Sequence, residues 1–346
     1  MANQHIQYSI IVPSFNRQDE IEELLLSFQN LKFDPDRAEL IIADDGSTDQ
    51  TREVVRDFQE RVPFQLHFYH QNNQGPGAAR NMGMEKARGE FFIFIDSDCT
   101  VHPDWLKNID RSLASGQAEA FGGRDSYRDD FPPLLKAINY SMTSFITTGG
   151  LRGRKGKRLV KFYPRSFNMG LSRNLYQKIG GFGSLRHGQD IEYSNRIIKS
   201  GAKVIYIDDA VVYHKRRTSI RKFFRQVFNW GVARINLFKI DATMLEPLHS
   251  APALATLFLI LLIIASLISW QIWSVTRWLF LAGIAVLALS AAHASIQYKN
   301  WKLLFLVPVI IPIQIIGYGL GFLAAYFYRV ILGRSEFTGF RKKYYQ

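Results

Sequence analysis

Cysteine is almost absent from this chain of 346 residues, which contains only Cys99. A single cysteine excludes an intrachain disulfide, so covalent cross-links do not stabilise the fold. The first residues, MANQHIQYSIIVPSFNR, also lack the basic stretch that begins a secretory signal, and their apolar run is short. We therefore expect the large polar part of the chain to stay on the cytoplasmic side of a membrane.

Charged residues are missing from three long stretches near the C-terminus, 254–270, 278–296 and 303–328, which contain no Asp, Glu, Lys or Arg. Apolar stretches of about 17 to 26 residues are candidates for membrane-spanning segments. The rest of the chain is basic, with 43 Lys and Arg against 30 Asp and Glu, for a net charge of +13. This surplus predicts an anionic partner. Because the basic residues concentrate beside the apolar stretches, it favours membrane lipids over nucleic acid.

The first hundred residues alternate between strand-like and helix-like patterns. Apolar runs at 8–13, 38–45, 64–70 and 91–95 predict buried strands, and segments with helical spacing separate them. Such β-then-α units predict an α/β fold with a parallel sheet and helices on both faces. Ligands of these sheets bind beyond the carboxyl ends of the strands. Polar residues gather at those ends here, at Pro13-Ser14, Asp44-Asp45, the loop 71–77 and Asp96-Ser97-Asp98.

Asp96 and Asp98 stand on alternate residues directly after the last of these buried strands. Two carboxylates in this arrangement, with Ser97 between them, suit one hard divalent cation that bridges the phosphates of a nucleotide. A polar turn gives the same tripeptide, so the neighbouring motifs decide between the two interpretations.

Two of those motifs carry groups that suit a nucleotide. In DDGSTDQT, Asp44 and Asp45 have acceptor oxygens for a base N–H or a ribose hydroxyl. In GPGAARNMG, glycines such as Gly77 let the backbone and Arg80 come close to a phosphate or a base. The strand ends therefore predict a nucleotide site.

Four motifs, SIIVPSFNR, DDGSTDQT, GPGAARNMG and FIDSDC, occur in the order and spacing of the family 2 glycosyltransferases of the GT-A (Rossmann-like) fold. The first 215 residues resemble that family. The resemblance implies a nucleotide-sugar donor, most often a UDP-sugar, and a bound Mg²⁺ or Mn²⁺. It assigns donor binding to Pro13, Ser14, Asp44, Asp45, Gly77, Arg80, Asp96 and Ser97, and the metal to Asp96, Asp98 and His214.

Residues 166–199 resemble the family's acceptor side. SFNMGLSRNLYQKIGGF resembles the stretch that precedes the catalytic acid, and Asn168 is a polar position within it. Asp190, near the start of a predicted helix, matches the second acid of the family's Glu-Asp pair, whereas Gln189 replaces the first. An inverting transfer needs a carboxylate that takes the proton of the attacking hydroxyl, and the resemblance assigns this role to Asp190. The alternative is an acid that merely stabilises a helix N-terminus.

The segment 216–245 is basic and aromatic, and its apolar residues fall on one helical face. We expect such a helix to lie in the headgroup region of an anionic leaflet. Its QVFNW sequence resembles the Q-x-x-R-W motif of processive synthases, with Asn229 in place of arginine. We assign Gln226 and Trp230 to the acceptor or the diphosphate, and the departure at Asn229 leaves processivity open.

These patterns predict a GT-A catalytic domain at 1–215, an interfacial helix at 216–245, a transmembrane region at 250–330 and a basic cytoplasmic tail at 331–346. Lys299, Lys302 and the basic tail predict two full spans before a third apolar segment. That segment is expected to be broken, and either re-entrant or lying along the surface, because it contains Pro308, Pro312, Gly317, Gly319 and Gly321. GYGLGF, near its end, resembles membrane-bound glycosyltransferases of the succinoglycan-biosynthesis type. The expected location is the inner membrane, multi-pass, with the catalytic domain in the cytoplasm.

The leading functional prediction is an inverting glycosyltransferase that adds a sugar to a hydroxyl of a lipid-linked or membrane-proximal glycan. The first alternative is a polyprenyl-phosphate glycosyltransferase; its phosphate acceptor needs no general base, so Asp190 favours a hydroxyl. The second is a catalytically silent nucleotide-sugar-binding membrane scaffold, which only Gln189 suggests. The sugar, the acceptor and the involvement of a glycan-assembly complex stay open.

Overall fold

The computed structural model describes residues 6–114, 116–126, 131–144, 162–214 and 219–340. They fall into two compact units. The first, here called the sheet unit, comes from within residues 1–128 and 163–215, and the second, the helical unit, from within 129–162 and 216–341. Each is described by itself.

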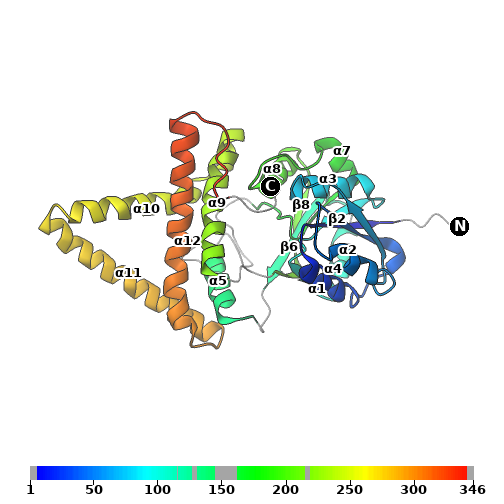
Figure 1. Cartoon of the computed structure of the whole chain (residues 1–346), viewed down its shortest axis with the longest axis horizontal. Helices are drawn as coiled ribbons and strands as arrows, with labels where there is room; N and C mark the ends of the chain where they lie inside the picture. The colour runs from blue at the N-terminus through cyan, green and yellow to red at the C-terminus, as the bar shows by residue number, and fades with distance from the viewer. Residues whose placement is uncertain (1–5, 115, 127–130, 145–161, 215–218, 341–346) are drawn as a thin grey trace. The chain divides into compact units, whose positions relative to one another are not determined.

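The sheet unit contains an eight-stranded sheet in the order β3-β2-β1-β4-β7-β6-β8-β5 (Figure 1). β1, β2, β3 and β4 pair in parallel, as the alternating pattern predicts. β7 is antiparallel to both β4 and β6, β8 is parallel to β6, and β5 is antiparallel to β8. The expected parallel sheet is therefore one half of a mixed sheet. The strands are Tyr8–Ser14 (β1), Ala38–Asp44 (β2), Gln65–His70 (β3), Phe91–Phe94 (β4), Cys99–Val101 (β5), Ala120–Ser126 (β6), Met169–Ser172 (β7) and Val204–His214 (β8).

Alternate strand residues point to opposite sides of this sheet, and both sides carry buried apolar residues. Helices pack against both faces and cover them. On β1, Ile10 and Val12 pack in one buried cluster with residues of α1, α2 and α4, and Ile11 packs in another with residues of α3, α7 and α8. The helices of the unit are Gln18–Phe28 (α1), Thr51–Asp57 (α2), Pro76–Lys86 (α3), Trp105–Leu113 (α4), Arg173–Ile179 (α7) and Gln189–Lys199 (α8), with a 3-10 turn at Pro35–Arg37 (η1).

Glu39, on β2, is a buried acid at the edge opposite to the strand ends discussed above. It accepts hydrogen bonds from Ser9 Oγ at 2.6 Å, from Arg88 N at 2.6 Å and from Arg88 Nε at 2.8 Å. Burial raises the pKa of Glu39, but these hydrogen bonds and the Arg88 charge outweigh burial, so the pKa lies below its ordinary value of 4.5. The stabilisation is therefore complete above pH 4.5 and is lost as the pH falls through the lower folded-state pKa.

We expect Glu39→Gln to lower the free energy of unfolding at pH 7 by roughly 1–3 kcal/mol, because a buried charged hydrogen-bond acceptor is lost. The loss is not larger because the charged partner, Arg88, is partly exposed, so solvent screens the ion pair. Urea unfolding of the full chain measures this change. Glu60→Gln, at an exposed position of the same unit, is the control and should change the free energy by no more than about 0.5 kcal/mol. A destabilisation by Glu39→Gln that does not shrink in acid would contradict the ionised state assigned to Glu39.

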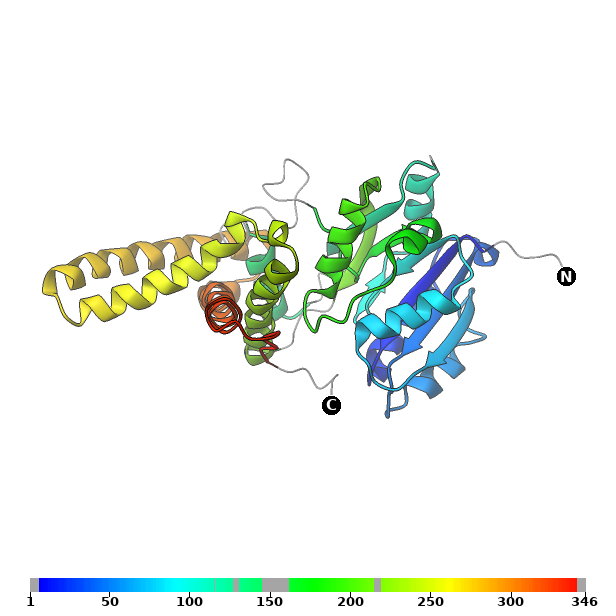
Figure 2. The same cartoon turned by 90° about the horizontal axis from the view of Figure 1, so that it is seen from above.

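The helical unit consists of long helices (Figure 2). Three segments of the described residues are long and apolar enough to cross a membrane: Pro247–Ser266, Trp270–Gln297 and Leu303–Ile331. The elements of the unit are Pro133–Thr143 (α5), Ile220–Ile240 (α9), a 3-10 turn at Ala242–Met244 (η2), Pro247–Ser266 (α10), Trp270–Gln297 (α11), Leu303–Tyr326 (α12) and a π-helical turn at Phe327–Ile331 (η3).

The expected break in the last apolar segment is wrong, because α12 is one continuous helix that contains Pro308 and Pro312. An internal proline removes a backbone hydrogen bond, at a cost of about 3 kcal/mol. In helices of apolar surroundings, contacts with neighbouring helices offset this loss. α12 has such contacts with α5, α9, α10 and α11.

α9 and α12 lie side by side, with glycines at their contact. A Cβ on Gly317 would lie 2.7 Å from Val227, one on Gly321 2.0 Å from the carbonyl oxygen of Phe228, and one on Gly231 2.1 Å from a carbonyl oxygen of α12. Small residues allow the same close approach between helices in membranes. This contact covers part of the apolar face of α9 that we expected to rest in lipid.

α5 lies within the range expected for the catalytic domain but belongs to the helical unit. Its residues Asn139, Tyr140 and Ser141 form hydrogen bonds with side chains of Tyr298, His293 and Gln314, at 2.9, 3.0 and 2.8 Å. Three consecutive polar residues therefore tie α5 to the end of α11 and to α12.

Candidate active site

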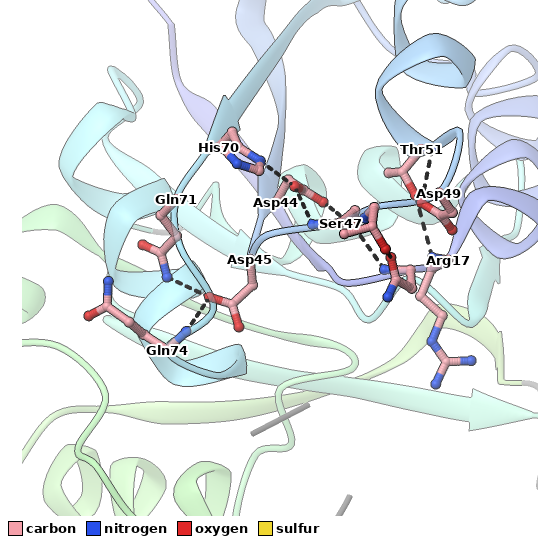
Figure 3. A network of polar contacts seen from close by, with 11 residues as sticks. Arg17, Asp44, Asp45, Ser47, Asp49, Thr51, His70, Gln71 and Gln74 are labelled. Atoms are coloured by element: carbon pink, nitrogen blue, oxygen red, sulfur yellow. Dashed lines mark hydrogen bonds and ion pairs between the residues drawn. The ribbon is translucent and has the colours of Figure 1, made fainter. Parts of the chain in front are cut away.

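The loops after β1 and β2 are joined by hydrogen bonds at the carboxyl edge of the sheet (Figure 3). Asn16, which has a φ of 50°, accepts from Thr48 N at 2.8 Å, and its own N–H donates to Ser47 Oγ at 2.8 Å. Pro13 and Ser14 end β1 just before this junction and are buried. The two strand ends thus form one connected surface, as the sequence predicts.

Asp44 ends β2 with its carboxylate buried. Its Oδ2 accepts from Ser47 N at 3.0 Å and contacts His70 Nδ1 at 2.7 Å, and its Oδ1 accepts from Ser47 Oγ. Three of the roughly four acceptor positions of a carboxylate are therefore in use. Asp44 holds the β2–α2 turn and the end of β3 together (Figure 3).

Asp45 is also buried and points toward the loop 71–77 (Figure 3). Its Oδ1 accepts from Gln71 Nε2 at 2.7 Å and from Gln74 N at 2.9 Å, and its Oδ2 accepts from Gly75 N at 2.6 Å. This carboxylate fixes the backbone that leads into α3. The donor-binding role of both aspartates stays a prediction.

Arg80, on α3, is directed at the first aspartate of the D-x-D tripeptide. Its Nη2 donates to Asp96 Oδ1 at 2.5 Å, and the side chains of Arg80 and Asp96 are 7% and 30% exposed. The Arg80 Nε is buried with no hydrogen-bond partner within the described residues. Cys99 N donates to Asp96 O at 3.1 Å, which closes a turn around Ser97 and Asp98. The structure thus brings Asp96 and Arg80 together, and their role in donor binding stays a prediction.

His214, the expected third metal ligand, is placed by the sheet. Its backbone pairs with Cys99, the residue after Asp98, so the register brings the end of β8 to the D-x-D turn. Its side chain lies outside the part of the chain that the structure describes. Among the described residues there is no cluster of three or more His, Cys, Asp or Glu side chains that could hold a metal ion.

Gly77 lets the N-termini of α3 and α8 meet. A Cβ on Gly77 would lie 2.7 Å from Gln189 Nε2, and the same Nε2 donates to the carbonyl oxygen of Gly183 at 3.2 Å. Gln189, which stands where the family has an acid, is therefore a buried packing residue. Its place beside α3 brings the next residue, Asp190, toward Arg80.

Asp190 forms an ion pair that the sequence did not indicate. Arg165 Nη1 donates to Asp190 Oδ2 at 2.9 Å, and both side chains are 25% exposed. Burial raises the pKa of Asp190, but the charges of Arg165 and Arg80 and the hydrogen bonds from Arg165 and the Ile191 N–H outweigh it, so the pKa lies below its ordinary value of 3.8. Asp190 is therefore ionised at neutral pH and able to accept a proton, although two arginines weaken it as a base.

Asn168 is buried in the sheet unit, with its amide used internally. Its Oδ1 accepts from Trp105 Nε1 at 3.0 Å, and its Nδ2 donates to the carbonyl oxygens of Arg124 and Ala210 at 3.1 and 2.8 Å. These bonds join α4, β6 and β8. The expected acceptor contact of Asn168 stays a prediction.

Gln226 and Trp230 lie on α9, in the helical unit. Both side chains are partly exposed. Between them, Asn229 is buried and forms two hydrogen bonds with the backbone of Phe340. The residue that replaces the arginine of the Q-x-x-R-W motif is therefore used to hold the C-terminal segment.

Residues 9–180 match the model of Glycosyl transferase family 2, and residues 153–342 match that of Glycosyl transferase family 21. Glycosyltransferase AglE of Haloferax volcanii is 24% identical over 245 residues, which are 68% of this chain and 78% of AglE.

A second relative matches over a shorter stretch. The GalNAc(5)-diNAcBac-PP-undecaprenol beta-1,3-glucosyltransferase of Campylobacter jejuni is 37% identical over 115 residues, which are 33% of this chain and 37% of that enzyme. The match thus spans little more than a third of that relative's length.

A solved structure supports the fold along most of the chain. Mannosyltransferase PcManGT from Pyrobaculum calidifontis, in complex with GDP-Man and Mn²⁺, matches with a TM-score of 0.62 at 20% identity, over 89% of this chain and 87% of that chain. Because 89% of the chain is more than either unit contains, the match includes residues of both units. With the two family matches and this fold, the chain belongs to glycosyl transferase family 2, and its sheet unit has the GT-A fold.

Proposed function

We propose that this glycosyltransferase inverts the anomeric centre while it moves a sugar from a nucleotide-sugar to a hydroxyl of a lipid-linked or membrane-proximal glycan. The observation that carries the proposal is the meeting of α3 and α8, which sets the pair Arg80–Asp96 beside the pair Arg165–Asp190. A relative whose substrate is an undecaprenol-linked glycan supports the acceptor class.

A divalent cation, Mg²⁺ or Mn²⁺, is proposed to bind at Asp96 and Asp98. Their carboxylate oxygens are the hard ligands that these ions prefer, and one oxygen of Asp96 is not engaged by Arg80 in the bonds described above. The Mn²⁺ in the complex of PcManGT supports this choice. When bound, the ion supplies positive charge that stabilises a leaving diphosphate.

Other residues of this chain position the donor site and accept the proton. Arg80 holds Asp96 in place, and the carboxylates of Asp44 and Asp45 fix the loops that would receive the nucleotide. Asp190 accepts the proton of the acceptor hydroxyl. Its pairing with Arg165 must weaken first, and the diphosphate of the donor is an anion that competes for the same guanidinium.

A phosphate acceptor, such as polyprenyl phosphate, is the second candidate. The lowered pKa of Asp190, caused by Arg165 and Arg80 despite burial, makes it a weak base. A phosphate needs no deprotonation by the enzyme, so this observation favours it. The scaffold hypothesis rests on Gln189 in place of an acid, and the packing of Gln189 against Gly77 gives this residue a structural role instead.

We further propose that α10 and α11 cross the inner membrane as a hairpin, whereas α9 and α12 lie along the cytoplasmic surface. Figure 1 shows α12 lengthwise and Figure 2 shows it end-on, whereas α10 and α11 are seen along their lengths in both views, so the hairpin runs crosswise to α12. A span of 20 residues in α10 is about 30 Å long, which matches the hydrocarbon core. Trp270, Trp273 and Trp278 are exposed near the tip, as aromatic residues at a membrane interface are.

The charges of α9 support an in-plane position for its partner α12. α9 contains Arg221, Lys222, Arg225, Arg234 and Lys239. Each such residue costs roughly 2.5–3.5 kcal/mol at the centre of a membrane-spanning helix. Because α12 is packed along α9 through glycines, it shares the same depth. Two crossings then leave both ends of the chain on the cytoplasmic side.

Single cysteines test this topology, since Cys99 is buried. We expect Ser269→Cys, at the hairpin tip, to react with a membrane-impermeant maleimide added to spheroplasts. Ser335→Cys, after α12, should react only after permeabilisation. Ser335 is exposed and Ser269 is partly exposed in the structure. Reaction of Ser335→Cys in intact spheroplasts would show that α12 crosses the membrane.

The proposed enzyme function is tested with a panel of UDP- and GDP-sugars. We expect one donor to release its nucleoside diphosphate when the full chain is given Mn²⁺ and a membrane-lipid extract from its host. Release that is equal with and without the chain, for every donor in the panel, would contradict the proposal.

A further inference from the structure

Two buried asparagines attach the C-terminal segment to α9. Asn229 Nδ2 donates to Phe340 O at 2.9 Å, and Phe340 N donates to Asn229 Oδ1 at 2.9 Å. Asn236, about two turns further along α9, donates from its Nδ2 to Phe337 O at 2.9 Å. The exposed fractions of Asn229 and Asn236 are 6% and 0%. The segment is therefore held by bonds to its backbone, which do not depend on its side chains.

Asn236 also contacts the end of the preceding helix. Its Oδ1 accepts from Arg329 Nη1 of η3 at 3.0 Å, and its backbone oxygen accepts from the same nitrogen at 3.3 Å. One amide thus joins α9, η3 and the C-terminal segment. The side chain of Asn236 has both its oxygen and its nitrogen in use within the helical unit.

Aromatic and cationic groups cover the end of the segment. The ring centroid of Phe340 lies 4.9 Å from that of Phe228 and 6.2 Å from that of Phe224. The guanidinium carbon of Arg225 lies 5.5 Å from the centroid of the Phe340 ring, within range of a cation–π interaction. All three partners of Phe340 belong to α9.

Gly339 makes this close approach feasible. Its φ is +57°, and a Cβ there would lie 2.6 Å from Asn229 Oδ1 and 3.3 Å from Val232 Cγ2. Gly333, earlier in the same segment, has a similar φ of +63°, yet a Cβ there would meet nothing within 4 Å. The two glycines share a backbone conformation and differ in their contact with α9, so they form a matched pair for an experiment.

We propose that the segment Phe337–Phe340 is an intramolecular ligand of α9, and that Asn229 and Asn236 are positioning residues that use it to hold α9 against α12. Residue 340 meets residue 229 and residue 337 meets residue 236, so the segment runs back along α9 from the end of η3. α9 is consequently fixed by α12 and by the segment.

The docked segment should matter for sugar transfer, an expectation that rests on the proposed function. Gln226 and Trp230, assigned to the acceptor or the diphosphate, are on the helix that the segment fixes. Releasing the segment should therefore impair use of the acceptor while donor binding, assigned to the sheet unit, is retained. It also gives a reason for Asn229 in place of arginine, since the side-chain amide both donates to the C=O and accepts from the N–H of one residue, Phe340.

Hydrogen exchange of the full chain in nanodiscs tests the docking. In the wild type we expect the amide of Phe340, which donates to Asn229 Oδ1, to be protected. Gly339→Ala and Asn229→Asp should each speed the exchange of this amide by roughly tenfold, as undocking of the segment allows. Gly333→Ala should leave it within about twofold of the wild type, because it disturbs no contact. Asn229→Asp keeps the side-chain size but replaces the donor to Phe340 O by a second acceptor.

The docking is overturned if the Phe340 amide of the wild type exchanges as fast as in a free peptide, or if Gly339→Ala and Asn229→Asp retain wild-type protection. For the positioning role, we expect Gly339→Ala to raise the KM for the acceptor roughly fivefold or more with unchanged donor affinity, and Gly333→Ala to do neither. Lost protection with an unchanged acceptor KM would contradict it. If the wild type itself transfers no sugar, the proposed function fails, whereas the exchange result still decides the docking.

Discussion

Asp190→Asn should lower sugar transfer to a hydroxyl acceptor by roughly 10²-fold or more, the usual contribution of a general base. The amide keeps the size of the carboxylate but has no basic lone pair for the acceptor proton. Donor affinity should not fall, because removing this charge leaves Arg165 and Arg80 more available to a diphosphate. Steady-state transfer rates and a separate donor titration measure the two effects.

Glu192→Gln is the matched control for that experiment. Glu192 lies in the same first turn of α8, but its carboxylate is paired with Arg196 at 2.6 Å rather than with Arg165. Its loss should affect transfer much less. Near-normal turnover of Asp190→Asn would favour a phosphate acceptor, and a loss of donor binding would place Asp190 on the donor side.

The pH dependence of transfer should reflect the ion pair at Asp190. Since Arg165 and Arg80 hold the pKa of Asp190 below 3.8 against the effect of burial, acid should not protonate it until the pH falls below that value. Arg165→Gln removes the nearer positive charge, so the pKa rises and the acid limb of the pH–rate profile should move to higher pH. An unchanged acid limb would mean that Asp190 does not control the rate.

Asp98→Ala should abolish metal-dependent donor binding, with the affinity falling at least about 10²-fold, because one of only two proposed carboxylate ligands is removed. Asp96→Ala should have the same effect on binding, but it also leaves the buried Arg80 without its carboxylate partner. A buried unpaired charge is destabilising by several kcal/mol. Asp98→Ala is therefore the cleaner test.

Donor titration with Mn²⁺ and with EDTA measures this prediction. Asp104→Ala, just beyond β5, is the control, since its side chain contacts only Lys32 and His102 among the ion pairs described. It should bind donor as the wild type does. Donor affinity of the wild type that is the same in EDTA would refute a metal at the D-x-D tripeptide.

The first half of the sheet was predictable because its signals are local. Alternating apolar runs and helical spacing encode β1 to β4, and parallel strands bring their carboxyl ends to one edge. The bonds from Asp45 to Gln71, Gln74 and Gly75 could have been predicted on this basis, since β2 and β3 are adjacent in the sheet.

The ion pair of Asp190 was not predictable from the sequence, because Arg165 lies 25 positions away, in the loop before β7. Periodicity reports which face of an element is buried, not which charges of separate elements meet. The role of Asn229 was hidden for the same reason, since its partner Phe340 is 111 positions distant. A departure from a motif was visible, but its structural purpose was not.

α5 shows how composition misleads about unit boundaries. Its sequence, PLLKAINYSMT, is only moderately apolar and lies far from the long apolar helices in the chain. Its polar residues nevertheless bond to α11 and α12. A truncation after residue 215 would separate α5 from these partners and expose its buried face, so the sheet unit should be studied within the full chain.

The most direct test of the account is transfer of a labelled sugar into lipid. Membranes that contain the full chain are incubated with the donor identified by the panel and Mn²⁺, and the label is measured in the lipid extract. We predict label in a lipid-linked glycan for the wild type, and a loss of roughly 10²-fold or more for both Asp98→Ala and Asp190→Asn. Wild-type label that appears only in water-soluble products, or lipid label that both variants retain, would contradict the account.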